Sequence, residues 1–214
     1  MTFREYIDYR WQDILLYTFQ HIQVVLISVG IAAVISVVLA LLVQGRPIPR
    51  QIALTITATM LTIPSFALLG LFVGPFGLGA LPTIIALTVY AIFPILRNVV
   101  TGLESVPAEV EEAAKGMGLS TTRRMAIVRV PLAWPVLLNG IRVSTILCVA
   151  IAAIAAAVNG PGLGQLIFEG LARIGGANSL NAVLTGVLGV MVVALVLDLL
   201  FVLIARLTTS RGIR

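Results

Sequence analysis

Long uninterrupted runs of apolar residues are the feature that most constrains the fold of this chain. A helix needs about 20 apolar residues to span the hydrocarbon core of a membrane. Five segments reach that length, at about 22–43, 52–73, 80–100, 132–157 and 182–206. Because 59% of the residues are hydrophobic and only 11% are charged, a water-soluble fold could not bury this apolar surface. The sequence therefore predicts an all-α integral membrane protein with five transmembrane helices.

The basic residues indicate how these helices are oriented, because cytoplasmic loops carry an excess of Lys and Arg. On one side of the predicted spans lie Arg4, Arg10 and Arg173. On the other side lie Arg46, Arg50, Arg97, Lys115, Arg123, Arg124, Arg129, Arg206, Arg211 and Arg214. We therefore expect the N-terminus outside and the C-terminus in the cytoplasm. The 101–131 loop is then cytoplasmic, and the 74–79 and 158–181 loops are external.

The predicted spans form one membrane domain over residues 22–206, followed by a cytoplasmic tail at 207–214. Residues 1–21 lack the apolar core and cleavage site of a secretory signal. They are rich in aromatic residues, which indicates either an amphipathic helix at the outer interface or an aromatic belt before the first span. His21 is expected to be an interfacial residue. Since there is no second histidine, a His-based metal site is excluded.

Prolines interrupt two of the predicted spans, because each removes a backbone hydrogen bond and kinks its helix. Pro64 lies in the middle of the second span, flanked by Thr62 and Ser65, and Pro94 lies late in the third. A broken helix at membrane depth either packs within protein or lines a cavity. Both interpretations stay open, and Thr62, Pro64, Ser65 and Pro94 are the candidates for a translocation path.

Two charged residues, Arg142 and Asp198, fall inside the fourth and fifth predicted spans. A charge within the membrane is a functional-site hypothesis by default. The alternative, which we favour, is an ion pair between the two spans, because both residues lie at a similar depth from the inner face.

The predicted external loops are rich in glycine and resemble tight turns or re-entrant caps rather than nucleotide motifs. The candidate outer-loop residues are Gly77, Gly79, Asn159, Gly162 and Gly164.

The cytoplasmic loop is a polar interruption with helix signals of its own. Residues 105–118 predict a short helix with Ser105 as its cap, Pro107 in the first turn and glutamates near its start. Gly116 and Gly118 end it, and a second helix is expected from about Ser120 to Pro131. Three carboxylates on one helix are usually a solvated face. The glycine hinge and the small alanines instead favour a docking projection.

The spacing within this loop resembles the EAA signature of ABC importer permeases. Glu112-Ala113-Ala114 is followed by three residues, Gly118, nine residues and Val128-Arg129-Val130-Pro131. Two valines stand where the family usually has Ile and Leu. The resemblance implies a MetI-like permease fold whose short helix inserts into a groove on an ATPase subunit. The coupling residues would then be Glu111, Glu112, Ala113, Ala114, Gly116, Gly118, Val128 and Pro131.

A wider resemblance links the chain to permeases of osmoprotectant importers, which carry glycine betaine, carnitine, choline or proline betaine. It rests on IPSFALLG at 63–70, AIFPILRNVVTGLESVP at 91–107, VPLAWPVLLNGIR at 130–142 and GLGQLIFEGL at 162–171. The run at 159–162 departs from the Gly-Ala-Gly-Gly typical of that family, which affects the detail of the outer gate.

The sequence has no GxxxxGK[ST] motif, so this chain is not expected to bind ATP or to act as an enzyme. The resemblance places ATP and Mg on a partner ATPase dimer. It also implies an extracytoplasmic substrate-binding protein, a second permease chain, identical or paralogous, and the surrounding lipid of a prokaryotic cell membrane. No nucleic acid is expected.

Three other functions remain open at this point: a permease for another solute such as an amino acid, an ATP-independent channel or secondary transporter, and a membrane scaffold without a transport role.

Overall fold

The computed structural model describes residues 1–209, and all regular structure within them is helical. The last two basic residues of the expected cytoplasmic tail, Arg211 and Arg214, lie outside the described residues. In chain order the helices are α1 (Phe3–Val43), α2 (Pro47–Met60), α3 (Ser65–Phe76), α4 (Ala80–Glu104), α5 (Ala108–Gly116), α6 (Thr121–Arg124), α7 (Val130–Ile154), α8 (Gly164–Ala172) and α9 (Ser179–Thr208). A π-helical turn, Met125–Arg129, precedes α7, and a 3₁₀ turn, Ala155–Val158, follows it.

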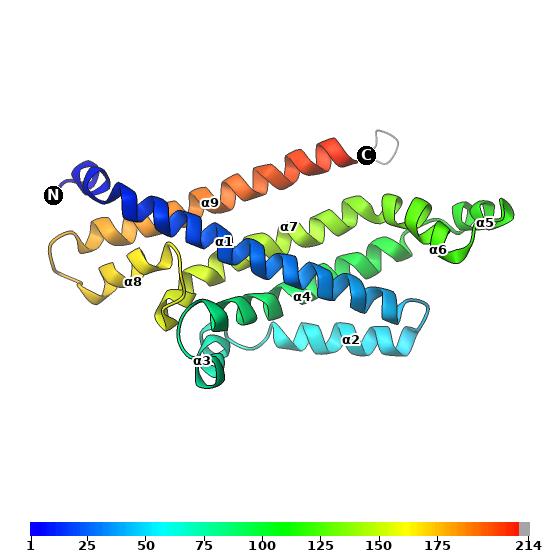
Figure 1. Ribbon diagram of the computed structural model, residues 1–214, viewed down its shortest axis with the longest axis horizontal. Coiled ribbons are helices and arrows are strands. Elements are labelled where there is room, and N and C mark those ends of the chain that lie inside the picture. Colours follow the sequence, from blue (N-terminus) through cyan, green and yellow to red (C-terminus); the bar gives the residue numbers. More distant parts are fainter. Residues whose placement is uncertain (210–214) are drawn as a thin grey trace.

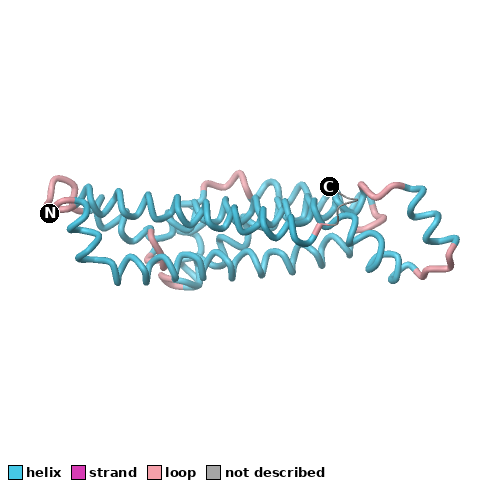
Figure 2. Tube along the Cα trace, turned by 90° about the horizontal axis from the view of Figure 1, so that it is seen from above, coloured by secondary structure: helices cyan, strands magenta, loops and turns pink. Residues whose placement is uncertain are grey.

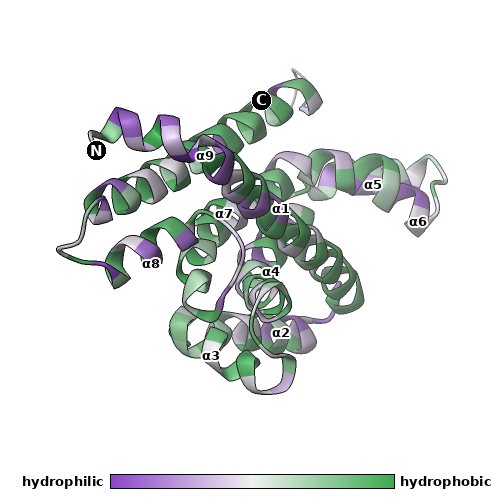
Figure 3. Ribbon diagram, turned by 60° about the vertical axis from the view of Figure 1, so that its left-hand side comes forward, coloured by the Kyte–Doolittle hydropathy of each residue, from purple (hydrophilic) through white to green (hydrophobic). Residues whose placement is uncertain are grey.

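The long helices run along one axis of an elongated molecule (Figures 1 and 2). α5 and α6 project from one end, here called the α5 end. The N-terminus and α8 lie at the opposite end, here called the α8 end. Hydrophilic segments gather on α5–α6, on α8 and at the start of α1, whereas the long helices between them are mainly hydrophobic (Figure 3). This distribution is the one that a membrane imposes on a helical bundle.

Within the described residues, four helical segments are long and apolar enough to cross a membrane: Phe3–Val43, Ala80–Glu104, Thr121–Val158 and Ser179–Thr208. A fifth is reached if α2 and α3 together form one span, although they are bent by 94° at the break between them. The predicted 52–73 helix is therefore two helices, because Pro64 lies outside α2 and caps the start of α3. By contrast, α4 continues through Pro94 without interruption.

The core lies where α1, α4 and α7 meet. Its fully buried members include Val25 on α1, Leu87 and Leu96 on α4, and Val149 on α7. α2 buries none of its residues, and α9 buries only a few of its own. The apolar side chains of these two outer helices therefore face the surroundings of the chain.

Close backbone approach holds α4 against α7. A Cβ placed on Gly140 would lie 2.6 Å from the Cβ of Asn98 and 3.1 Å from the carbonyl oxygen of Pro94. A Cβ on Gly102 would lie 3.0–3.2 Å from side chains of α7. Small residues of this kind let membrane helices approach closely. Because lipid is as apolar as the helices, no hydrophobic driving force pulls them together, and van der Waals contact stabilises their packing instead.

Hydroxyl groups from both neighbours bind α4 in the turn before Pro94. Ser144 of α7 donates to the carbonyl of Ala91 at 3.0 Å, and Ser36 of α1 donates to the carbonyl of Ile92 at 3.1 Å. A proline weakens the helical hydrogen bonds of the preceding turn, and neighbouring hydroxyls can replace them. These contacts explain why α4 stays continuous at Pro94.

The N-terminal segment is helical and joins the first span at a kink. α1 begins at Phe3 with a capping box between Thr2 and Glu5 and runs to Val43, and non-helical dihedral angles at Arg10 mark the kink between its two helical parts. The interfacial position of residues 1–21 stays a prediction. The expectation that His21 is interfacial is wrong, since its side chain is fully buried. It lies against the loop after α7, which local sequence does not reveal.

The α4–α7 contact yields a stability prediction. Gly140→Ala should destabilise the purified protein by about 1–3 kcal/mol, because the new methyl group overpacks the contact with Asn98. Thermal unfolding in detergent measures this loss. The matched control is Gly30→Ala in α1, where a Cβ meets nothing within 4 Å. Equal melting temperatures for the two variants would contradict the proposed tight packing.

Candidate coupling site and translocation path

The projection at the α5 end begins with a proline. Pro107 is the N-cap residue of α5, and Ser105 instead caps the end of α4, where its hydroxyl donates to the carbonyl of Gly102 at 2.9 Å. The expectation that Ser105 caps the short helix is therefore wrong. The reason is local: the residue before a proline is disfavoured in the helical region, so Val106 cannot continue a helix into Pro107.

Gly118 ends α5 in the left-handed conformation, with φ of 79°. The amide of Leu119 donates to the carbonyl of Ala114 at 3.2 Å, and the amide of Gly118 donates to that of Lys115 at 2.9 Å. These two bonds form a Schellman motif, in which glycine is the favoured residue. Ser120 then caps α6 by accepting from the amide of Arg123. The hinge expected at Gly118 is thus a defined turn, whereas Gly116 lies within α5.

Adjacent glutamates on α5 point in different directions. The side chain of Glu112 is exposed, as is Ala113, while Ala114 is buried. Glu111 turns inward and accepts a hydrogen bond from Nε of Arg129 at 2.9 Å. Its second oxygen lies 3.5 Å from Nε of Arg124. Glu112 and Ala113 therefore lie on the exposed face of α5, whereas Glu111 belongs to an internal ion pair.

The hydrogen bond from Arg129 holds the pKa of Glu111 below its usual range, and the charge of Arg124 adds to the effect. A carboxylate with a depressed pKa stays ionised near neutral pH. The ion pair is therefore intact near neutral pH.

The second helix of the projection is continuous with α7. α6 passes into the π-helical turn Met125–Arg129, and the amide of Val130 donates to the carbonyl of Met125, five residues earlier. Pro131 has no amide hydrogen and follows directly in the first turn of α7. The predicted separate helix is thus the first part of one helical segment that runs from Thr121 to Val158. π-helical turns of this kind frequently mark functional sites.

The break between α2 and α3 contains three of the four path candidates. Thr62 and Pro64 are exposed, and Ser65 is half-buried. Tyr90 of α4 donates its phenol hydrogen to the carbonyl of Ile63 within the break. Pro94, the fourth candidate, lies one turn further along α4, so the broken helix and the proline turn of α4 are neighbours. Tyr90 was not singled out from the sequence, although a tyrosine inside an apolar span is itself a signal.

The two glycine-rich loops meet at the α8 end. The amide of Gly79 donates to the carbonyl of Val158 at 2.9 Å, and Asn159 adopts a left-handed conformation with φ of 58°. A Cβ on Gly164 would lie 2.1 Å from the carbonyl oxygen of Ala153, so only glycine fits there. Gly77, by contrast, meets no neighbouring atom within 4 Å of its Cβ position.

His21 lies beneath the second of these loops. Its Nε2 is 3.1 Å from the carbonyl oxygen of Val149, and a Cβ on Gly162 would lie 2.8 Å from its Nδ1. Gly162 also has φ of 122°, a conformation that side chains rarely adopt. The imidazole therefore links α1, α7 and the loop, and it explains why glycine occupies position 162.

The two charges inside the spans lie together. Nε of Arg142 is 2.6 Å from Oδ1 of Asp198, and its terminal nitrogen donates to Oδ2 at 2.8 Å. This bidentate geometry is the strongest form of Arg–carboxylate pair. The pair joins α7 to α9, in agreement with the interpretation of Arg142 and Asp198 as an ion pair.

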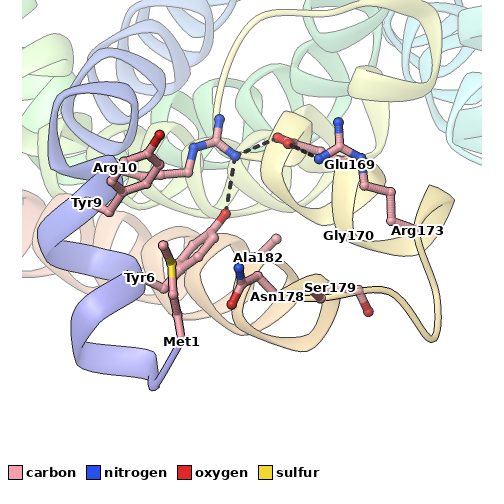
Figure 4. Close-up of a pocket in the computed structure, with 11 residues that line it drawn as sticks. Met1, Tyr6, Tyr9, Arg10, Glu169, Gly170, Arg173, Asn178, Ser179 and Ala182 are labelled. Carbon is pink, nitrogen blue, oxygen red and sulfur yellow. Dashed lines mark hydrogen bonds and ion pairs between the residues drawn. The ribbon is translucent and has the colours of Figure 1, made fainter.

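A further polar cluster at the α8 end was not predicted as a site. Arg10 donates to Glu169 at 2.8 Å and to the phenol oxygen of Tyr6 at 3.2 Å, while Arg173 lies 3.2 Å from the other oxygen of Glu169 (Figure 4). These side chains line a pocket of about 260 Å³ between α1, α8 and α9. The network fixes the start of α1 to α8. Within residues 1–209, no group of three or more His, Cys, Asp or Glu side chains is placed to hold a metal ion.

Comparison with known proteins identifies the family. Residues 32–210 match the family described as "Binding-protein-dependent transport system inner membrane component". The chain belongs to this family. As a permease of an ABC importer, it is expected to contact other subunits through the surfaces that its own fold leaves exposed, and Glu112 and Ala113 lie on such a surface.

Relatives of this permease cover nearly its whole length. It is 35% identical to the osmoprotectant import permease protein OsmW of Salmonella typhimurium, over 92% of each chain. It is 32% identical to the choline transport system permease protein OpuBB of Bacillus subtilis, over 94% of this chain and 91% of that protein. It is 30% identical to the glycine betaine/carnitine/choline permease OpuCB of the same organism, with the same coverage.

Solved structures show the same fold. The permease resembles a chain of the MetNI methionine ABC transporter in an inward-facing conformation, with a TM-score of 0.79 at 23% identity, over 92% of this chain and 96% of that one. A second crystal form gives a TM-score of 0.75 at 26% identity, over 90% and 94%. The MetI-like fold expected from the sequence is therefore confirmed.

The Arg142–Asp198 pair yields a second prediction. Asp198→Leu alone and Arg142→Leu alone should each lower the melting temperature, because each leaves an unpaired charge inside a span. The double variant should melt closer to the wild type than either single variant does. Thermal unfolding in detergent of the wild type, the two single variants and the double variant forms a double-mutant cycle. Strictly additive losses of melting temperature would show that the two residues do not interact.

Proposed function

We propose that this permease is the translocating subunit of an ATP-driven importer for quaternary-ammonium osmoprotectants such as glycine betaine, carnitine or choline. The exposed Glu112–Ala113 face of α5 carries the proposal, because α5 projects from one end of the molecule (Figure 1) and no other part of residues 1–209 covers these two side chains. This is the helix on which the EAA spacing falls, and the match extends through Gly118 and Pro131.

The substrate class comes from the relatives. The names of the three relatives, OsmW, OpuBB and OpuCB, give their solutes as osmoprotectant, choline and glycine betaine/carnitine/choline. Each of these relatives aligns with more than nine-tenths of this chain. These solutes share a quaternary ammonium group, which proteins recognise with aromatic cages. Because aromatic residues are only 7% of this chain, we assign that recognition to the extracytoplasmic binding protein.

The α5 end lies in the cytoplasm in this proposal, and the N-terminus and α8 lie outside. Among residues 1–209, eight basic residues on the α5 side of the spans against three on the other support this orientation. A partner ATPase dimer then binds α5 and supplies ATP and Mg. The binding protein approaches the loops around Gly79 and Gly162. A second permease chain, identical or paralogous, packs beside this one, since a single chain of this size does not enclose a path.

Substrate passes, in this proposal, along the break between α2 and α3. Thr62 and Pro64 are exposed there, and Tyr90 of α4 holds the non-helical backbone at Ile63. Irregular backbone at membrane depth is tolerated where it lines a cavity, which favours this surface over the continuous helices.

An amino acid importer is the second candidate, and the likeness to the methionine transporter is the observation that favours it. That likeness reaches 26% identity, whereas the osmoprotectant permease OsmW reaches 35% over a similar share of the chain. Because fold is shared more widely than substrate, the higher sequence identity to OsmW supports the osmoprotectants over an amino acid.

Reversing the charge at the tip of α5 tests the coupling role. Glu112→Lys should abolish ATP-dependent uptake into proteoliposomes that hold the permease, its ATPase and its binding protein, and it should reduce co-purification of the ATPase. The protein should still insert and melt like the wild type, because Glu112 is exposed. Arg4→Glu, an exposed reversal at the opposite end, is the control. Wild-type uptake by Glu112→Lys would refute the docking role of α5.

Competition for uptake tests the substrate. Unlabelled carnitine and choline should reduce ATP-dependent uptake of radiolabelled glycine betaine in the same proteoliposomes. Methionine at the same concentration should leave it unchanged. Uptake of methionine in place of glycine betaine would support the amino acid alternative, and uptake without ATP would support a channel or secondary transporter.

A further inference from the structure

The EAA spacing singles out α5 as a contact for a partner, but it does not say how movement of α5 reaches the membrane. Two connections leave α5. Towards α4 the chain passes through residues 105–107, a short link outside any helix. Towards α7 it passes through the Schellman turn at Gly118 and then through continuous helix. Neither backbone connection alone holds α5 rigidly, because both contain a non-helical turn.

The ion pair of Glu111 bridges the second of these turns. Arg129 lies 18 residues further along the chain, in the last turn before α7, and its Nε donates to Glu111 Oε2 at 2.9 Å. Arg124 lies 3.5 Å from Oε1, so both carboxylate oxygens face a guanidinium group. The exposed fraction of the Glu111 side chain is 23% and that of Arg129 is 29%, against 94% and 74% for the surface pair Arg4–Asp8.

We propose that Glu111 is a positioning residue, which with Arg129 forms a strut that makes α5 and α7 move as one body. The inference rests on the proposed function, since it requires that a partner moves α5. The strut transmits that movement into α7 rather than letting the turn at Gly118 absorb it. Glu112, one residue along, has the separate role of facing the partner.

Contacts further along α7 carry the movement on. Arg142 is joined to Asp198 of α9 by the bidentate ion pair. Gly140 is in close contact with the Pro94–Asn98 turn of α4. α4 in turn reaches the α2–α3 break through Tyr90. A displacement of α5 that the strut transmits therefore has a continuous route of contacts through α7 and α4 to the α2–α3 break that borders the proposed path.

The Glu111–Arg129 ion pair does not titrate near pH 7. The hydrogen bond from Arg129 lowers the pKa of Glu111 in the folded protein. The stability that this bond adds is therefore fully present above the pKa of a glutamate in the unfolded chain, about 4.3, and is lost only as the pH falls through the lower pKa of the folded state. A test near pH 7 therefore reports the substitution alone.

The experiment measures transported solute per ATP hydrolysed in the reconstituted complex of permease, ATPase and binding protein. Glu111→Gln and Arg129→Gln should each lower this ratio by about 2- to 30-fold, the range in which residues on a coupling path act. ATP hydrolysis and co-purification of the ATPase should persist, because the partner-facing side of α5 is unchanged. Arg124→Gln should have a smaller effect, since its contact is longer.

The double variant Glu111→Gln/Arg129→Gln separates a strut from two independent partner contacts. For a strut, the double variant should be no worse than either single variant, whereas independent contacts give additive losses. Asp8→Asn, which removes an exposed carboxylate at the opposite end, is the matched control and should keep the wild-type ratio.

Two results would overturn the strut: an unchanged ratio in Glu111→Gln, or a loss that accompanies loss of the bound ATPase, which would make Glu111 a docking contact. If the wild-type complex itself showed no ATP-dependent uptake, the proposed function would fail and the strut with it. If the wild-type complex takes up solute with ATP and the Glu111→Gln variant transports as much solute per ATP as the wild type, the strut proposal fails while the proposed function stands.

Discussion

Backbone hydrogen bonding in lipid is the constraint on which the rest of this structure depends. A peptide group that loses its helical partner inside the hydrocarbon core must find another within the protein. Where a helix breaks or contains a proline, the structure supplies one. Tyr90 donates to the carbonyl of Ile63 in the α2–α3 break, and Ser144 and Ser36 donate to carbonyls in the turn before Pro94 of the continuous helix α4. The positions of these polar side chains thus determine where the chain can depart from regular helix.

The same constraint explains the division of the molecule into a compact body and a looser part. α4 and α7 pack through Gly140 and Gly102, and the hydroxyls of α1 and α7 bind α4, so these three helices form the body. α2 buries no residue and meets α3 at a sharp bend. In the proposed function the two parts have different roles, because the compact body transmits movement and the broken helix lines the path of the solute.

Sequence reasoning succeeded where the signal was local or depended on similar depth in the membrane. The apolar runs located α4, α7 and α9, although the 52–73 run is two helices. The glycine at 118 marked the end of α5, and the matching depths of Arg142 and Asp198 predicted a pair that the structure brings together. It failed where a competing local effect won, as at Ser105, which caps the end of α4 because Pro107 is the N-cap residue of α5. It also failed where the partner is distant, as for His21 beneath Gly162.

The sequence by itself determined that this chain is helical, spans a membrane and carries a permease signature, because the length of the apolar runs and the spacing of the motif can be read directly along the chain. Only the tertiary structure decided which way each polar side chain points. Glu111 and Glu112 are neighbours in sequence, yet one meets Arg129 and the other is exposed. The physical reason is that a helix turns by about 100° per residue, so the direction of a side chain acquires meaning only once the neighbouring helices are in place.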